Sequence, residues 1–136
     1  GEDVQIPNPW QECSSLEEAG KLAGFSFTAP EAVEGYTEKC IAAIENDIAE
    51  VIFSKGDNDD ASLCFRKGLG TEDISGDYNT YDTVEQQTIG DRTVTCKGND
   101  GLAYTAIWND GTYSYAVMCN AGMNAEQLTA WVQGLA

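Results

Sequence analysis

Short turns separate a series of strand-like segments from Glu38 onward, and this constrains the fold more than any other feature. Apolar residues alternate with a period near two in these segments, which span residues 40–44, 48–53, 62–66, 84–89, 93–97, 103–108 and 112–119. Asn109-Asp110-Gly111 between the last two is a strong hairpin signal. Because such short connections force neighbouring strands to run antiparallel, we expect a single antiparallel sheet of about six or seven strands, largely a meander.

Helical spacing of apolar residues marks one segment near each end of the chain. Ser14 is a predicted cap for the first helix, Glu17 completes its capping box, and Gly24 ends it. Asn124 and the residues after it cap the second helix. A single sheet needs one face covered, so the predicted class is α+β, with the N- and C-terminal helices on one face of the sheet.

The length and the apolar content fit one domain. The chain has 136 residues, and 42% of them are hydrophobic, which is enough to fill a core. Two prolines, Pro7 and Pro9, predict an extended N-terminal arm over residues 1–12, followed by a single α+β domain over residues 13–136. Ten side chains are the expected core: Leu16, Leu22, Phe25, Ile52, Phe65, Val94, Trp108, Val117, Leu128 and Trp131.

Charge and composition exclude several classes of function. Seven basic residues against 23 acidic ones give a net charge of −16, which opposes binding to nucleic acids and to anionic membrane surfaces. The chain has no histidine, so histidine-activated nucleophiles and histidine-ligated metals are excluded. No run approaches the ~18 apolar residues of a membrane span. We expect a monomer without catalytic residues, cofactor or metal, and not inserted in a membrane.

Five cysteines leave two interpretations open. No two of them lie within four residues of each other, so no zinc knuckle is indicated. They are either small buried hydrophobes or members of disulfides in a secreted domain. Bridges within the sheet are disfavoured, because the predicted order places a strand between the cysteine-bearing strands.

An acidic loop at residues 57–60 invites a calcium interpretation. Counted from Asp57, however, positions 6 and 12 of the calcium-loop template are Ser62 and Gly68, where the template needs glycine and glutamate. A solvated β-turn is the simpler expectation, and a weak calcium-binding surface domain stays as an alternative.

The polar stretch over residues 68–81 is the strongest candidate for a functional site. It lacks a periodic apolar pattern, and such long loops are often functional. The candidate ligand-binding residues in it and just before it are Arg66, Lys67, Asp73, Ser75, Asp77, Tyr78 and Asn79. Two alternatives are a purely structural loop held by charge pairs, and a catalytic carboxylate pair of a hydrolase. We expect Arg66 to pair with Asp73 or Asp77 and fix the loop against the sheet.

Motifs along nearly the whole chain support a resemblance. They are Ser15-Leu16-Glu17-Glu18-Ala19, Gly24-Phe25, Pro30, Gly35-Tyr36, Arg66-Lys67, Asp73-Ile74-Ser75-Gly76-Asp77-Tyr78-Asn79, Lys97-Gly98-Asn99-Asp100-Gly101, Trp108 with Asp110-Gly111, and Tyr113-Ser114-Tyr115. In these the chain resembles a family of extracytoplasmic domains of unknown function from Gram-positive anaerobes, often carried on lipoproteins or behind one membrane anchor.

The resemblance implies a location and a fold, and no activity. We therefore expect an extracellular, cell-envelope-associated module that is tethered in its full-length form. The chain opens on Gly1 without an initiator Met, as a processed or trimmed chain would. The expected function is non-catalytic binding or sensing of a protein or small-molecule ligand, with the calcium-binding domain and the carboxylate-dependent hydrolase as alternatives.

Overall fold

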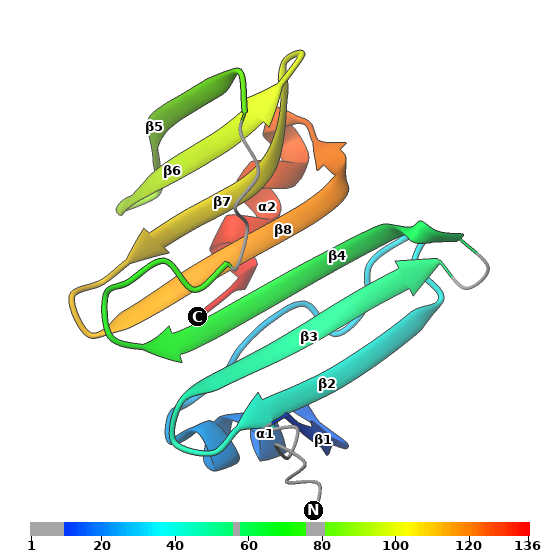
Figure 1. The fold of residues 1–136 in the computed structure, drawn as a ribbon, viewed down its shortest axis with the longest axis vertical. Helices are drawn as coiled ribbons and strands as arrows, with labels where there is room; N and C mark the ends of the chain where they lie inside the picture. The colour runs from blue at the N-terminus through cyan, green and yellow to red at the C-terminus, as the bar shows by residue number, and fades with distance from the viewer. Residues whose placement is uncertain (1–9, 56–57, 76–80) are drawn as a thin grey trace, which may run out of the picture.

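The computed structural model describes residues 10–55, 58–75 and 81–136. These residues form one eight-stranded antiparallel sheet and two α-helices (Figure 1), which confirms the α+β class and the single sheet. In chain order the elements are β1 (Gln11–Cys13), α1 (Leu16–Ala23), β2 (Glu38–Ile44), β3 (Ile48–Lys55), β4 (Asn58–Leu69), β5 (Thr83–Ile89), β6 (Arg92–Asn99), β7 (Leu102–Asn109), β8 (Tyr113–Met123) and α2 (Ala125–Gly134).

The strand order corrects the expected topology. The sheet runs β1-β2-β3-β4-β8-β7-β6-β5, so two four-stranded meanders meet where β4 pairs with β8. The strands number eight because Gln11–Cys13, at the end of the predicted arm, pairs with β2. The chain leaves β4 in the middle of the sheet and re-enters it at β5, on the edge. We call residues 70–82, which make this connection, the crossing segment.

Both helices lie on the same side of the sheet. In Figure 1 they are behind it, with α1 against β1–β3 and α2 against β5, β7 and β8. We call this side, to which Val51, Phe65 and Val117 point, the helix-covered face. The helices alone do not cover it, because Phe27 and Ala29 from the chain between α1 and β2 are also buried in its core.

Most of the expected core is confirmed, with one exception. Five of the ten expected side chains are buried: Phe65, Val94, Trp108, Val117 and Leu128. Four more pack partly buried against them: Leu16, Leu22, Phe25 and Trp131. The tenth expectation is wrong in its location. Ile52 pairs with Cys64 on the opposite side of the sheet, because its neighbours Val51 and Phe53 take the inward positions of β3.

The cap of α1 lies one residue later than the sequence suggested. Ser15, and not Ser14, is the N-cap, and its side chain accepts a hydrogen bond from the backbone N–H of Glu18. Ser14 instead donates to the Glu18 carboxylate from its hydroxyl and its backbone N–H. The capping box of α2, formed by Asn124 and Gln127, is confirmed.

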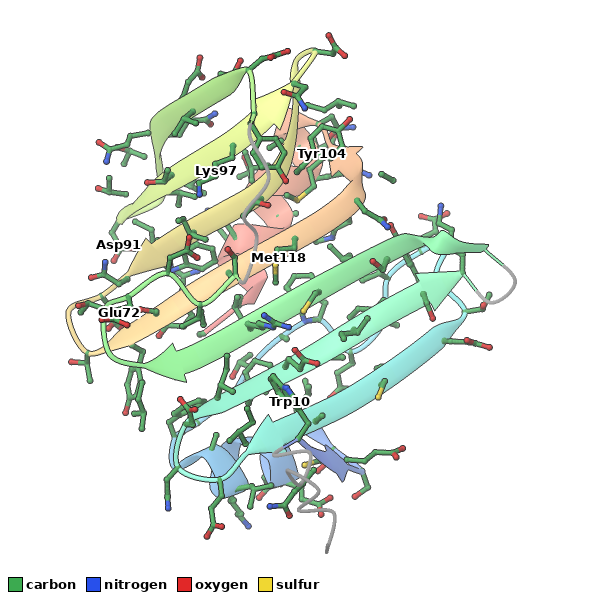
Figure 2. All side chains as sticks on the ribbon, viewed as in Figure 1. Trp10, Glu72, Asp91, Lys97, Tyr104 and Met118 are labelled. Atoms are coloured by element: carbon green, nitrogen blue, oxygen red, sulfur yellow. The ribbon has the colours of Figure 1, made fainter. Side chains whose placement is uncertain are left out.

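The side of the sheet away from the helices carries no secondary-structure element among the described residues. We call it the open face; it is the side turned toward the viewer in Figures 1 and 2. Neither helix is long and apolar enough to cross a membrane, so far as the described parts of the chain show.

Candidate functional site

One row of cross-strand neighbours spans the open face. The register places Glu50 beside Arg66, Arg66 beside Ala116, and Ala116 beside Ile107. The row continues through Thr95 of β6 to Gln86 of β5. Because side chains alternate along each strand, all of these point to the same side. The sheet thus aligns one charge pair, two small or apolar residues and two polar side chains in a single line.

The charge pair in this row is Arg66 with Glu50. Arg66 Nε donates to Glu50 Oε1 at 2.7 Å, and the two side chains are 23% and 9% exposed. Burial lowers the pKa of Arg66, but the Cys64 thiol and the Glu50 carboxylate outweigh this effect, and the net shift is upward. The guanidinium therefore stays charged and tied to Glu50.

The same guanidinium holds the crossing segment. Arg66 Nη1 donates to the carbonyl oxygens of Ile74 and Ser75, at 3.2 and 3.1 Å. The crossing segment is therefore fixed by Arg66, as expected, but through backbone carbonyls. The expected pairing with Asp73 is wrong: Asp73 Oδ2 lies 3.7 Å from Lys97 Nζ on β6. Asp77, the other expected partner, lies outside the described residues.

Further contacts attach both ends of the crossing segment to the sheet. At its start, the Gly70 carbonyl accepts a hydrogen bond from Ser114 Oγ of β8 at 2.8 Å. The Gly70 N–H donates to the Thr112 carbonyl, in the turn before β8, at 3.0 Å. At its end, the Tyr81 ring stacks on Tyr104 of β7 with a centroid distance of 6.1 Å. The crossing segment, which starts at the end of β4, thus contacts two neighbouring strands of the second meander: β6 through Asp73 and Lys97, and β7 through Tyr81 and Tyr104.

Glycine at position 68 makes room for one apolar side chain of this segment. A Cβ atom placed on Gly68 would lie 3.3 Å from Ile74 Cδ1 and 3.5 Å from Ile48 Cγ1. Ile74 therefore occupies the space above a residue without a side chain. This packing explains why the segment rests directly on β4.

Lys67 belongs to the other side of the sheet. It pairs with Tyr115 in the register and is buried on the helix-covered face. Its ammonium donates to the Ser26 carbonyl at 2.6 Å and lies 4.4 to 5.6 Å from the ring centroids of Phe25, Tyr113 and Tyr115. Burial lowers the pKa of Lys67. The sheet thus separates two residues that the sequence placed together as a candidate site.

The predicted site residues accordingly have different roles. Arg66 and Lys67 are both engaged in internal contacts, and Ser75 is a buried residue of the crossing segment whose carbonyl accepts from Arg66. Asp73 is exposed and borders the cavity described next. The remaining three, Asp77, Tyr78 and Asn79, lie outside the described residues.

An open cavity of about 360 Å³ lies between the crossing segment and the second meander. The crossing segment contributes Thr71, Glu72 and Asp73 to its wall. Most of the side chains from the strands are polar. The strands contribute Gln86, Thr93, Thr95, Ile107 and Asn109. Trp108 and Tyr115 also border the cavity, although the register turns their side chains to the helix-covered face. Hydroxyls, amides and carboxylates therefore surround this space, and its lining holds no lysine or arginine among the described residues.

Sequence reasoning missed the strand residues of this cavity. Gln86 and Thr95 fall within the strand-like segments 84–89 and 93–97 and are not among the predicted site residues. Their alternation with buried neighbours such as Val94 and Cys96 does predict that they share a face. The sequence does not predict which strands the crossing segment passes, and this decides which polar side chains become a wall.

Other candidate chemistry is either outside the described residues or placed elsewhere. The calcium candidate depends on Asp57 and on acidic side chains next to it, which are not described. Among the described residues, no three cysteine or acidic side chains gather as a metal site would require. All five cysteines are free thiols: Cys40 is exposed and the others are buried.

Comparison with protein-family models, with curated proteins and with solved structures finds no match for this chain.

Proposed function

We propose that the protein is a non-catalytic binding module whose ligand occupies the cavity between the crossing segment and strands β5–β7. One observation carries this proposal: the described parts of the crossing segment are fixed against the open face and leave a polar, accessible cavity beside them. A segment that only covered the sheet would be expected to fill this space with apolar side chains.

The cavity indicates the chemical class of the ligand. Glu72 and Asp73 bring negative charge, and Lys97, the cation that contacts Asp73, is already paired with it. The net charge of −16 repels anions from the whole surface. We therefore propose a small polar ligand without negative charge, which hydroxyl and amide groups such as those of Thr95 and Gln86 can bind by hydrogen bonds.

The resemblance supports the location. We propose that the module acts outside the cytoplasm, tethered to the cell envelope in its full-length form. The exposed positions of Glu72 and Asp73 give no reason to prefer the carboxylate-dependent hydrolase.

A titration with two panels of compounds tests the proposal. Uncharged saccharides form one panel and small organic cations the other, and binding is followed by isothermal titration calorimetry. Gln86→Ala should weaken binding of the best compound at least fivefold. Gln11→Ala, which changes another exposed glutamine, on β1, should leave it unchanged. Equal effects of the two variants, or no binding from either panel, would contradict the proposal.

A further inference from the structure

Strand β5 is an unprotected edge of the sheet. It is last in the strand order, and no strand among the described residues pairs with its outer side (Figure 1). All seven residues pair with β6 in one uninterrupted register, so the strand is regular along its whole length. The other edge, β1, has only three residues. The outer backbone groups of β5 are therefore a template to which another strand can bind.

The sequence of β5 has few of the features that usually block such binding, and its single charged residue is Glu85. It contains no proline, glycine, lysine or arginine, and no bulge interrupts its pairing. Six of its residues are exposed, and Val84, at 61% exposure, is the most exposed large apolar side chain among the residues that the structure describes. The strand is thus apolar enough and long enough for β-augmentation, in which a partner adds an extended segment to a sheet edge.

The charge around β5 defines the partner. Glu85 lies within the strand, Asp82 just before it and Asp91 in the turn just after it. The two nearby cations of β6 are engaged: Lys97 with Asp73, and Arg92 with the Val132 carbonyl. A second copy of this chain would bring another 16 negative charges to the same edge. A basic segment is therefore favoured over self-association.

A pocket beside β5 fits the side chains of such a segment. It lies on the helix-covered side, to which Glu85 points as the partner of the core residue Cys96. Its volume is about 220 Å³. Its lining includes the apolar side chains of Leu102, Met123 and Leu128, and Glu85 lines it as well. A lysine or arginine can place its aliphatic stem in this pocket and its charge beside Glu85.

We propose that β5 binds an extended, basic segment of a partner protein as a ninth strand. Alternate lysine or arginine side chains of this segment face the helix-covered side, next to Glu85. This proposal uses the outer backbone of β5 and Glu85 on the helix-covered side, whereas the small-ligand site proposed above uses Gln86 on the open face. The two proposals can therefore fail independently.

A nine-residue peptide of alternating lysine and valine is a suitable probe, because alternation places all its lysines on one side of a strand. Titrated into the full chain, it should bind saturably and slow the amide exchange of β5. Glu85→Lys should weaken binding at least tenfold. Glu45→Lys, the same charge change on the exposed β2–β3 turn, should change it less than twofold. Circular dichroism should show that both variants stay folded.

A second peptide separates strand addition from simple charge attraction. It has the same side chains, but all its backbone nitrogens are methylated, so it cannot donate hydrogen bonds to β5. We expect it not to bind. Equal binding of both peptides, equal losses in the two glutamate variants, or no binding at all would each overturn the proposal. So would a dimer of the chain alone that Glu85→Lys dissociates, since the occupant of the edge would then be a second copy.

Discussion

Replacing Arg66 by alanine tests whether one side chain holds the open face together. The change removes the 2.7 Å ion pair with Glu50 and the two hydrogen bonds to the carbonyls of Ile74 and Ser75. Glu50, only 9% exposed, is left with a charge and no cation beside it. Losing one partner of a buried pair costs about 3–5 kcal/mol. Because Arg66 is 23% exposed, we expect the lower end, about 3 kcal/mol.

Urea unfolding followed by tryptophan fluorescence measures this loss. With an m-value of ~1.5 kcal/mol/M, a loss of about 3 kcal/mol lowers the midpoint by ~2 M. Amide exchange gives a second readout, since the backbone N–H groups of residues 70–75 should exchange faster when Arg66 no longer fixes the segment.

Lys21→Ala is the matched control. Lys21 also forms an ion pair, with Glu17 at 3.3 Å, but both side chains are more than three-quarters exposed. Its loss should cost less than about 0.5 kcal/mol. Adding Glu50→Gln to Arg66→Ala removes the unpaired charge and should recover part of the stability. If Arg66→Ala unfolds at the same urea concentration as Lys21→Ala, the structural role assigned to Arg66 is wrong.

Three further predictions use other parts of the fold. Gly20→Ala should lower the free energy of unfolding by ~2 kcal/mol or more although alanine favours helices, because the new Cβ would lie 2.5 Å from the Phe25 carbonyl oxygen. Gly134→Ala, whose Cβ would have no contact under 3.4 Å, should not destabilise the protein in the same thermal melt. In the native protein only the exposed Cys40 should react quickly with a thiol reagent, because the other four thiols are buried and burial and Glu50 raise the pKa of Cys64 to about 12. All five thiols should react in urea. Fast reaction of several thiols in the native protein would contradict this prediction. Moderate sodium chloride should raise the melting temperature at neutral pH, because it screens a net charge of −16, and a lower melting temperature would refute this.

Local patterns in the sequence were sufficient to predict the class of the fold. Alternation in β4 places Leu63 and Phe65 inward, and both are fully buried. The hairpin expected at Asn109-Asp110-Gly111 forms, with Gly111 at a φ of 92° and the Asp110 carboxylate accepting from the Thr112 and Tyr113 N–H groups. These features depend on residues close in sequence, so a single chain reveals them.

Long-range pairing was not predictable in the same way. Nothing in β4 or β8 alone shows that they pair, and a continuous meander satisfies the same alternation. Their pairing sets the second meander beside β4, and this brings Lys97 of β6 to Asp73 and Tyr104 of β7 to Tyr81. The candidate site therefore depends on contacts between segments far apart in the sequence, which periodicity does not specify.

Intermolecular NOEs from a bound ligand test the central claim most directly. With the best compound from the two panels, we predict NOEs to the methyl groups of Ile107 and Thr95, which line the cavity on the open face. The methyl groups of Val132, buried on the helix-covered side, should show none. NOEs confined to the helix-covered side, with none to Ile107 or Thr95, would contradict the account of the open face as the binding surface.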